Sequence, residues 1–119
     1  MSTRSKMTTA YLGEIMHSNI SELPEVRFLT SGDVSDADRE AARQAVRAAL
    51  SEVRGVVKEA QVTLSVVDDP ALPRPALAQA VVDLNGRRLR AQAAAPDLSE
   101  SIKLLQDRLA VRAAYLRAG

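Results

Sequence analysis

Arginine is the residue type in this sequence whose numbers and spacing most plainly suggest chemistry with a ligand. The chain has 119 residues, and its 16 basic side chains are thirteen arginines and three lysines. The planar guanidinium group donates a fork of hydrogen bonds that suits a phosphate better than the point charge of lysine does. The composition therefore suggests binding of a polyanion, although a GC-rich genome would produce the same bias.

The arginines of interest form three groups. One group recurs every fourth residue, which places its members in one row along a helix. A second group follows an Asn-Gly pair, and a third is a pair four residues apart near the C-terminus. In chain order, the candidate RNA-binding residues are Arg39, Arg43, Arg47, Arg88, Arg90, Arg108 and Arg112. Arg54 would lie two turns beyond the first group, and Arg87 sits at the turn, where a solvated role is expected.

The distribution of charge separates these groups. The whole chain has a formal net charge of +1, yet residues 87–119 alone contain seven basic and three acidic side chains. This excess favours a polyanion as the ligand of the second and third groups. For the first group, an ordinary solvated helix face is an equally good interpretation, because Asp36 and Glu40 lie beside its arginines.

Other kinds of chemistry find little support. The chain has no cysteine and one histidine, His17, so neither a thiolate metal site nor histidine-based catalysis is expected. The acid pairs Asp36/Asp38 and Asp68/Asp69 are interpreted as a helix cap and a turn. We predict no enzyme, no catalytic residue, no metal and no cofactor. The absence of a long apolar run predicts neither a signal peptide nor a membrane span, and favours the cytoplasm.

Hydrophobic periodicity predicts the element order β-α-β-β-β-α. The expected elements are a strand at 26–30, a helix from Ser35 to about Arg54, a strand at 61–67, a hairpin centred on Asn85-Gly86, and a helix from Asp97 to the C-terminus. Because amphipathic helices need a surface to cover, the expected fold is α+β, with two helices packed on one face of a four-stranded sheet. Residues 1–24 are expected to be a flexible leader, and residues 25–119 the domain.

The hairpin can be predicted in detail. Asn-Gly is the preferred pair for a two-residue type I′ turn, and that turn fixes the register of the strands. Asp83 should then face Arg88, and Val81 should face Arg90. The side chains expected on the core side are Ala80, Val82, Leu84, Leu89, Ala91 and Ala93. Since Arg90 has no acidic residue opposite it, it is the best single candidate for contact with RNA.

Aromatic residues are too few to form a base-stacking surface. Only Tyr11, Phe28 and Tyr115 are present, whereas recognition of single-stranded bases usually relies on aromatic side chains of a sheet. Binding through phosphates and shape, to structured RNA or DNA, is therefore expected. General binding of double-stranded RNA is a further interpretation of the same pattern.

Several motifs resemble one known family, the ribosome hibernation-promoting factors and ribosome-associated inhibitors. The resemblance is carried by LNGRRLRAQA at 84–93, by DLSESIKLLQDRL at 97–109, and by VRFLTSGDVSDADRE at 26–40, which is similar to the family's first strand and helix start. It covers about residues 25–117. The matching positions of the hairpin and last helix are Leu84, Asn85, Gly86, Leu89, Arg90, Ala91, Asp97, Ile102, Arg108 and Leu109.

This resemblance implies a cytoplasmic translation inhibitor that is not an enzyme. Such proteins bind the rRNA of the small ribosomal subunit in the channel for messenger and transfer RNA, during stress or stationary phase, and hold ribosomes dormant. Longer members carry a C-terminal domain that dimerises, so this chain is either a short form or the N-terminal domain of a longer protein. The alternative, motivated by a first helix less basic than usual for the family, is a self-association module of the same fold with weak or no ribosome binding.

Overall fold

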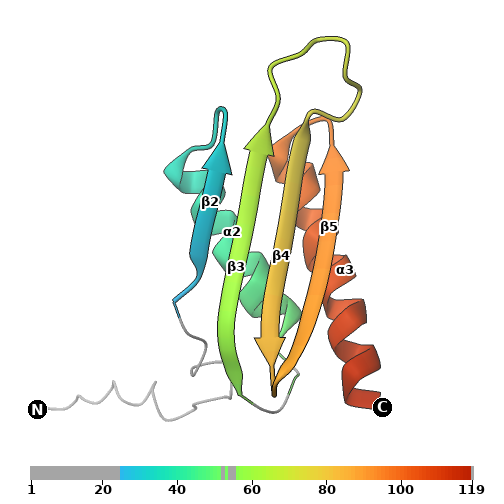
Figure 1. Ribbon diagram of the computed structural model, residues 1–119. Coiled ribbons are helices and arrows are strands. Elements are labelled where there is room, and N and C mark those ends of the chain that lie inside the picture. Colours follow the sequence, from blue (N-terminus) through green and yellow to red (C-terminus); the bar gives the residue numbers. More distant parts are fainter. Residues whose placement is uncertain (1–24, 52, 54–55, 119) are drawn as a thin grey trace, which may run out of the picture.

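A computed structural model describes residues 25–51, 53 and 56–118 (Figure 1). The expected leader at 1–24 lies outside the described residues. The elements are β2 (Arg27–Ser31), α2 (Asp36–Ala49), β3 (Val57–Val66), β4 (Ala76–Leu84), β5 (Arg87–Ala95) and α3 (Leu98–Ala118). The strands form one sheet in the order β2-β3-β4-β5, in which only the β2–β3 pair is parallel. Both helices cover the same face, which confirms the predicted α+β fold.

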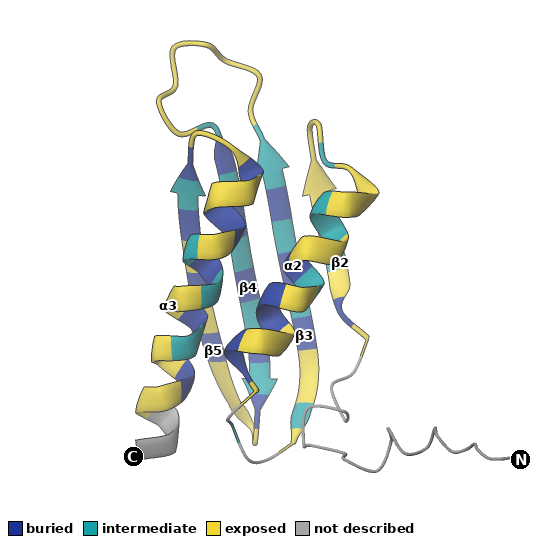
Figure 2. Ribbon diagram, turned by 180° about the vertical axis from the view of Figure 1, so that it is seen from behind, coloured by how far each residue is buried: buried dark blue, intermediate teal, exposed yellow. Residues whose placement is uncertain are grey.

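Buried and more exposed residues alternate along the strands, and the buried ones form the core. In β4 every second residue from Ala76 to Leu84 is buried, and the residues between them are half-buried. The side chains that face the helices from β4 and β5 are mostly alanines, which allow a helix to approach closely. Figure 2 shows the buried residues of both helices turned toward the sheet and their exposed residues turned away. Neither α2 nor α3 lies on the opposite face of the sheet.

The start of α2 is the predicted one, but its end is not. The Ser35 side chain accepts a hydrogen bond from the Asp38 backbone N–H at 3.1 Å, and the Asp38 carboxylate accepts one from the Ser35 N–H at 2.9 Å. This reciprocal pair is a capping box. The helix ends at Ala49 rather than near Arg54, and Arg54 itself lies outside the described residues.

A contact distant in sequence explains the next element. The side-chain Oδ1 of Asn85 accepts a hydrogen bond from the Val56 N–H at 2.9 Å, and the Asn85 N–H donates to the Val56 carbonyl at 2.9 Å. The hairpin turn thus holds the chain immediately before β3, which begins at Val57 and not at the predicted residue 61.

The predicted hairpin register is confirmed. Asp83 pairs with Arg88 and Val81 with Arg90 across the two strands. Asn85 and Gly86 both have positive φ, at 54° and 82°, as a type I′ turn requires. All six side chains expected on the core side of the hairpin are buried.

Two glycines with the same backbone angle should respond differently to substitution. Gly32 also has φ of 82°, but a Cβ atom there would lie 2.1 Å from the Val66 carbonyl oxygen, whereas one at Gly86 would meet nothing within 4 Å. Gly86→Ala should therefore cost about 1 kcal/mol, the ordinary penalty of a left-handed residue. Gly32→Ala should cost about 3 kcal/mol or more, because the backbone of β3 must also move. Urea unfolding of the two variants measures both values, and equal losses would contradict the steric explanation.

Candidate nucleic-acid interface

The hairpin and the last helix together form a basic groove. Arg88 and Arg90 come from β5, and Arg108 and Arg112 come from α3; all four line one open groove of about 710 Å³. Asp107 is the acidic residue among its lining side chains. The structure therefore brings together the two arginine groups that carry the local charge excess. We call this feature the β5–α3 groove.

Packing of α3 explains why these arginines meet. The Asp97 side chain accepts a hydrogen bond from the Glu100 N–H at 2.9 Å and so caps the start of the helix. The apolar stripe of the helix then lies against the alanine-lined face of the sheet, and its buried members are Leu98, Ile102, Leu105, Leu109 and Ala113. Arg108 and Arg112 each precede a buried residue of this stripe, which places them at the flank of the helix beside β5.

Arg108 is fixed by a contact that the sequence does not reveal. One of its guanidinium nitrogens donates a hydrogen bond to the backbone carbonyl of Gln92 at 2.8 Å. Gln92 lies on β5, the outer strand of the sheet. The side chain therefore reaches from the helix to the strand edge, which keeps a positive charge inside the groove.

The hairpin arginines stay exposed toward solvent. Arg88 faces Asp83 in the register, but the Asp83 carboxylate accepts a hydrogen bond from the Gly86 N–H at 3.1 Å. Within the described residues no ion pair forms between Asp83 and Arg88. Arg90 faces Val81, as predicted. Arg87 is exposed at the turn and lies outside the groove lining.

The arginine row of α2 lies elsewhere. Arg43 stacks over the ring of Phe28 on β2, with 5.4 Å from its guanidinium carbon to the ring centroid. β2 and β5 are the two outer strands of the sheet, and Figure 2 shows the start of α2 beside β2 and α3 beside β5. Arg43 and the β5–α3 groove therefore lie at opposite edges of the sheet. The seven candidate arginines thus form two separate surfaces rather than one.

Acidic neighbours partly neutralise the α2 row. Arg39 forms an ion pair with Asp36, and Arg43 forms one with Glu40. Arg47 is exposed, and no ion pair is seen for it among the described residues. A hydrogen bond from the Gln44 side chain, followed by the charge and hydrogen bond of Arg43, lowers the pKa of Glu40 below its ordinary value. Glu40 therefore remains an anion beside this row even in mildly acidic solution.

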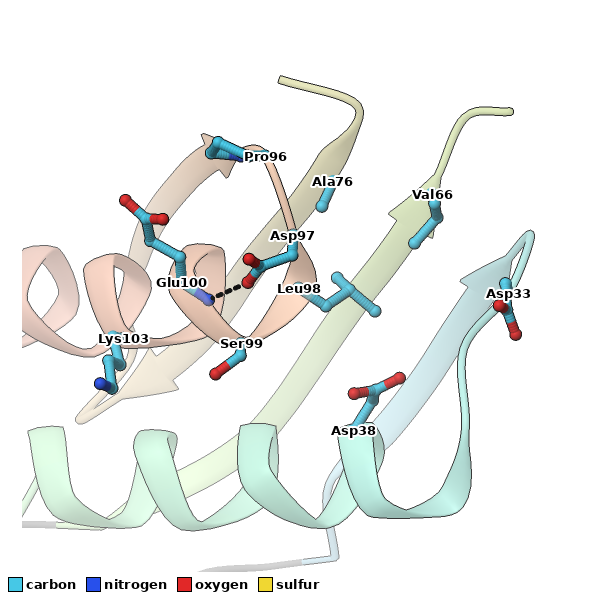
Figure 3. A pocket seen from close by; sticks show the side chains of 10 residues that line it. All are labelled: Asp33, Asp38, Val66, Ala76, Pro96, Asp97, Leu98, Ser99, Glu100 and Lys103. Carbon is cyan, nitrogen blue, oxygen red and sulfur yellow. Dashed lines mark hydrogen bonds between the residues drawn. The ribbon is translucent and has the colours of Figure 1, made fainter. Parts of the chain in front are cut away.

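The end of the molecule away from the hairpin is acidic. An open pocket of about 650 Å³ lies between the starts of the two helices. Figure 3 shows its acidic lining residues Asp33, Asp38, Asp97 and Glu100, with Lys103 as its basic residue. Two of these carboxylates have the capping roles predicted from the sequence. A polyanion would be repelled here, so the charge of the molecule is polarised along the direction of the strands.

One basic residue near the groove is not predicted by the sequence pattern. Arg74, in the proline-rich loop before β4, lines a second groove of about 430 Å³ together with Gln92 and Arg108. An isolated arginine in a loop carries no periodicity, so no sequence signal places it at the β5 edge.

Neither a metal centre nor a membrane span is found in the part of the chain that the structure describes. No cluster of three or more His, Asp or Glu side chains in this part could hold a metal ion. None of its helices combines the length and the apolar character needed to cross a bilayer.

The acid–base contacts of α2 can be tested by titration. Gln44→Ala should raise the pKa of Glu40 toward the ordinary value, because the hydrogen bond that most favours its charged form is lost. Arg43→Ala should also raise it. Carboxyl ¹³C shifts recorded against pH measure these midpoints. If neither substitution moves the midpoint, the contacts of the α2 row are absent in solution.

Comparisons with known proteins support the fold. No protein-family model and no curated protein sequence matches the chain at a significant level. Among solved structures, the chain is similar to a ribosomal subunit interface protein from Coxiella burnetii, with a TM-score of 0.62 and 18% identity over 79% of this chain and 98% of that one. It is also similar to the N-terminal domain of Thermus thermophilus Protein Y, with a TM-score of 0.64 and 24% identity over 79% of this chain and 100% of that one. The protein therefore has the fold of these two structures, and the resemblance seen in the sequence is confirmed at the level of the fold.

Proposed function

We propose that this protein is a ribosome-associated translation inhibitor of the hibernation class and not an enzyme. It binds rRNA of the small subunit in the channel for messenger and transfer RNA, in the cytoplasm, under stress or in stationary phase. The observation that carries the proposal is the convergence of four arginines in the β5–α3 groove, on a fold shared with a ribosomal subunit interface protein.

The chemistry of the groove suits the phosphates of an RNA. The groove is lined by four guanidinium groups and one carboxylate, that of Asp107. Each group donates in a plane, which matches the oxygens of a phosphate. Among the described residues, no exposed aromatic ring lies on the face of the sheet opposite the helices, so the RNA is recognised by its backbone and shape rather than by stacked bases.

The polarity of charge orients the protein on its ligand. Arg88, Arg90 and Arg112 lie toward the hairpin end of the sheet, while the acidic pocket lies where both helices begin. An RNA surface attracts the first end and repels the second. The protein therefore approaches the ribosome with its hairpin and the C-terminal half of α3 first.

The arginines of α2 are expected to contribute less to this binding. Two of the three already form ion pairs with acidic residues of α2. Because such a pair must break before the arginine can bind a phosphate, the net gain in binding free energy is smaller. This difference provides a matched control, since a double substitution in either surface removes the same charge.

Co-sedimentation with small ribosomal subunits across a salt series tests the proposal. Four phosphate contacts predict a fall in affinity of about a hundredfold between about 50 and 200 mM salt. Replacing Arg88 and Arg90 together with alanine should reduce the slope of log affinity against log salt by about 2, and affinity at low salt by at least about tenfold. The Arg39→Ala, Arg43→Ala double variant should lower the logarithm of the affinity by less than half as much as the Arg88, Arg90 double variant does.

Three outcomes would contradict the proposal. Absence of pelleting at low salt excludes ribosome binding, and a salt-independent dimer in light scattering would then favour the self-association module. Equal losses in the two double variants would show that the β5–α3 groove is not the main contact. Equal affinity for any long RNA duplex would replace ribosome recognition with general binding of double-stranded RNA.

A further inference from the structure

Among the described residues, no strand pairs with the outer edge of β5, which presents a row of backbone groups beside the arginines. In an antiparallel hairpin closed by a two-residue turn, residues alternate between hydrogen-bonding the partner strand and directing both backbone groups outward. Leu84 and Arg87 form the bonded pair at the turn, so the outward residues are Arg88, Arg90, Gln92 and Ala94. The Arg108 contact agrees with this assignment, because it reaches the outward carbonyl of Gln92.

At Gln92 the outward backbone carbonyl and the outward backbone N–H group differ in whether they have a hydrogen-bond partner among the described residues. The carbonyl already accepts the hydrogen bond from Arg108. Among the described residues, no acceptor is seen for the outward N–H group of Gln92. The site therefore offers a hydrogen-bond donor flanked by guanidinium groups, which is the arrangement that an anion requires.

A second groove, lined by two arginines and one carboxylate, continues the β5–α3 groove along the strand. The β5–α3 groove and the second groove adjoin, since Gln92 and Arg108 line both. Arg74 lies in the second groove, which is also lined by Ala94 and by the acidic Glu100. Beginning at Arg88, the path therefore passes Arg90 and Arg108 and reaches Arg74 near the far end of the strand.

We propose that this path holds a single sugar–phosphate backbone along the edge of β5, with outward N–H groups of the strand and the guanidinium group of Arg74 as additional phosphate ligands. The inference rests on the proposed function and specifies its ligand. Outward residues recur about every 7 Å along a strand, a distance similar to the spacing of successive phosphates in an extended nucleic acid. Bases then point away from the protein, so binding does not depend on their identity.

The same edge is poorly suited to a peptide strand. An added β-strand must donate to the outward carbonyls as well as accept from the N–H groups. Arg108 occupies the carbonyl of Gln92 in the middle of β5, and its side chain crosses the edge where the new strand would lie. The observations therefore favour a phosphodiester chain over a protein partner.

A matched pair of substitutions isolates the backbone donor. Gln92→Pro removes the outward N–H group, and proline is tolerated on an edge strand where that group faces away from the sheet. Gln92→Ala removes the side chain alone. Fluorescence anisotropy with a labelled oligouridine of about twelve nucleotides should show affinity about tenfold weaker for Gln92→Pro, and within about twofold of the wild type for Gln92→Ala. Circular dichroism confirms that both variants are folded.

Arg74 provides a second test that does not alter the backbone. Arg74→Ala should weaken oligouridine binding about five- to tenfold at 50 mM salt, the loss expected for one phosphate contact. Arg27→Ala on β2 removes the same charge at the opposite edge of the sheet and should change affinity by at most about twofold. An oligoadenosine of equal length should bind the wild-type protein within about threefold of oligouridine.

The outcomes separate this inference from the proposed function. If oligouridine binds as described but ribosomal subunits do not pellet with the protein, the inference holds and the ribosomal proposal fails. A second outcome is that subunits pellet with the protein and the Arg88, Arg90 double variant loses this binding, while Gln92→Pro and Arg74→Ala bind oligouridine like their controls. In that case the β5–α3 groove binds RNA, but the backbone N–H groups at the edge of β5 and Arg74 do not contact phosphates. A strong preference for one base would also overturn the inference.

Discussion

The close packing of α3 on an alanine-lined pair of strands is the interaction on which the candidate site depends. The side chains that β4 and β5 turn toward the helix include Ala78, Ala80, Ala91 and Ala93, and none of these is more than 4% exposed. Small side chains bring the helix axis near the sheet, so long side chains at the flank of the helix reach the strand edge. Arg108 does so and bonds to the Gln92 carbonyl. Larger residues on these strands would lift α3 away and separate the two walls of the groove.

The Asn85-Gly86 turn has a second role beyond joining two strands. It sets a register in which apolar side chains face the helices, and the same register directs the backbone of Arg88 and Arg90 out of the sheet. Asn85 also forms two hydrogen bonds with Val56, which fix the start of β3. One short motif thus determines the core side of the hairpin, the donors at its edge and the position of a neighbouring strand.

The two arginine surfaces illustrate why side-chain type alone does not define a binding site. Arg43 lies beside Glu40 and over the Phe28 ring, so its charge is partly satisfied within the domain. Arg90 faces Val81 and stays exposed. A phosphate binds most favourably to a cation that has no other partner. Arginines in similar local sequence patterns therefore differ in how strongly they can bind a phosphate. The acidic pocket at the helix starts adds a repulsive region that sharpens this contrast.

The sequence by itself determined the features that depend on near neighbours. Hydrophobic periodicity predicted the element order, the Asn-Gly pair predicted the register, and Ser35 and Asp97 predicted the helix starts, because each signal acts within a few residues. Only the tertiary structure decided that Arg43 lies over Phe28 of β2 at one edge of the sheet, while Arg88, Arg90, Arg108 and Arg112 line a groove at the other. It also decided that α2 ends at Ala49 and that Arg74 lines a groove with Gln92 and Arg108. These features follow from contacts such as Asn85 with Val56 and Arg108 with Gln92, between residues 29 and 16 positions apart, and local spacing carries no information about such contacts.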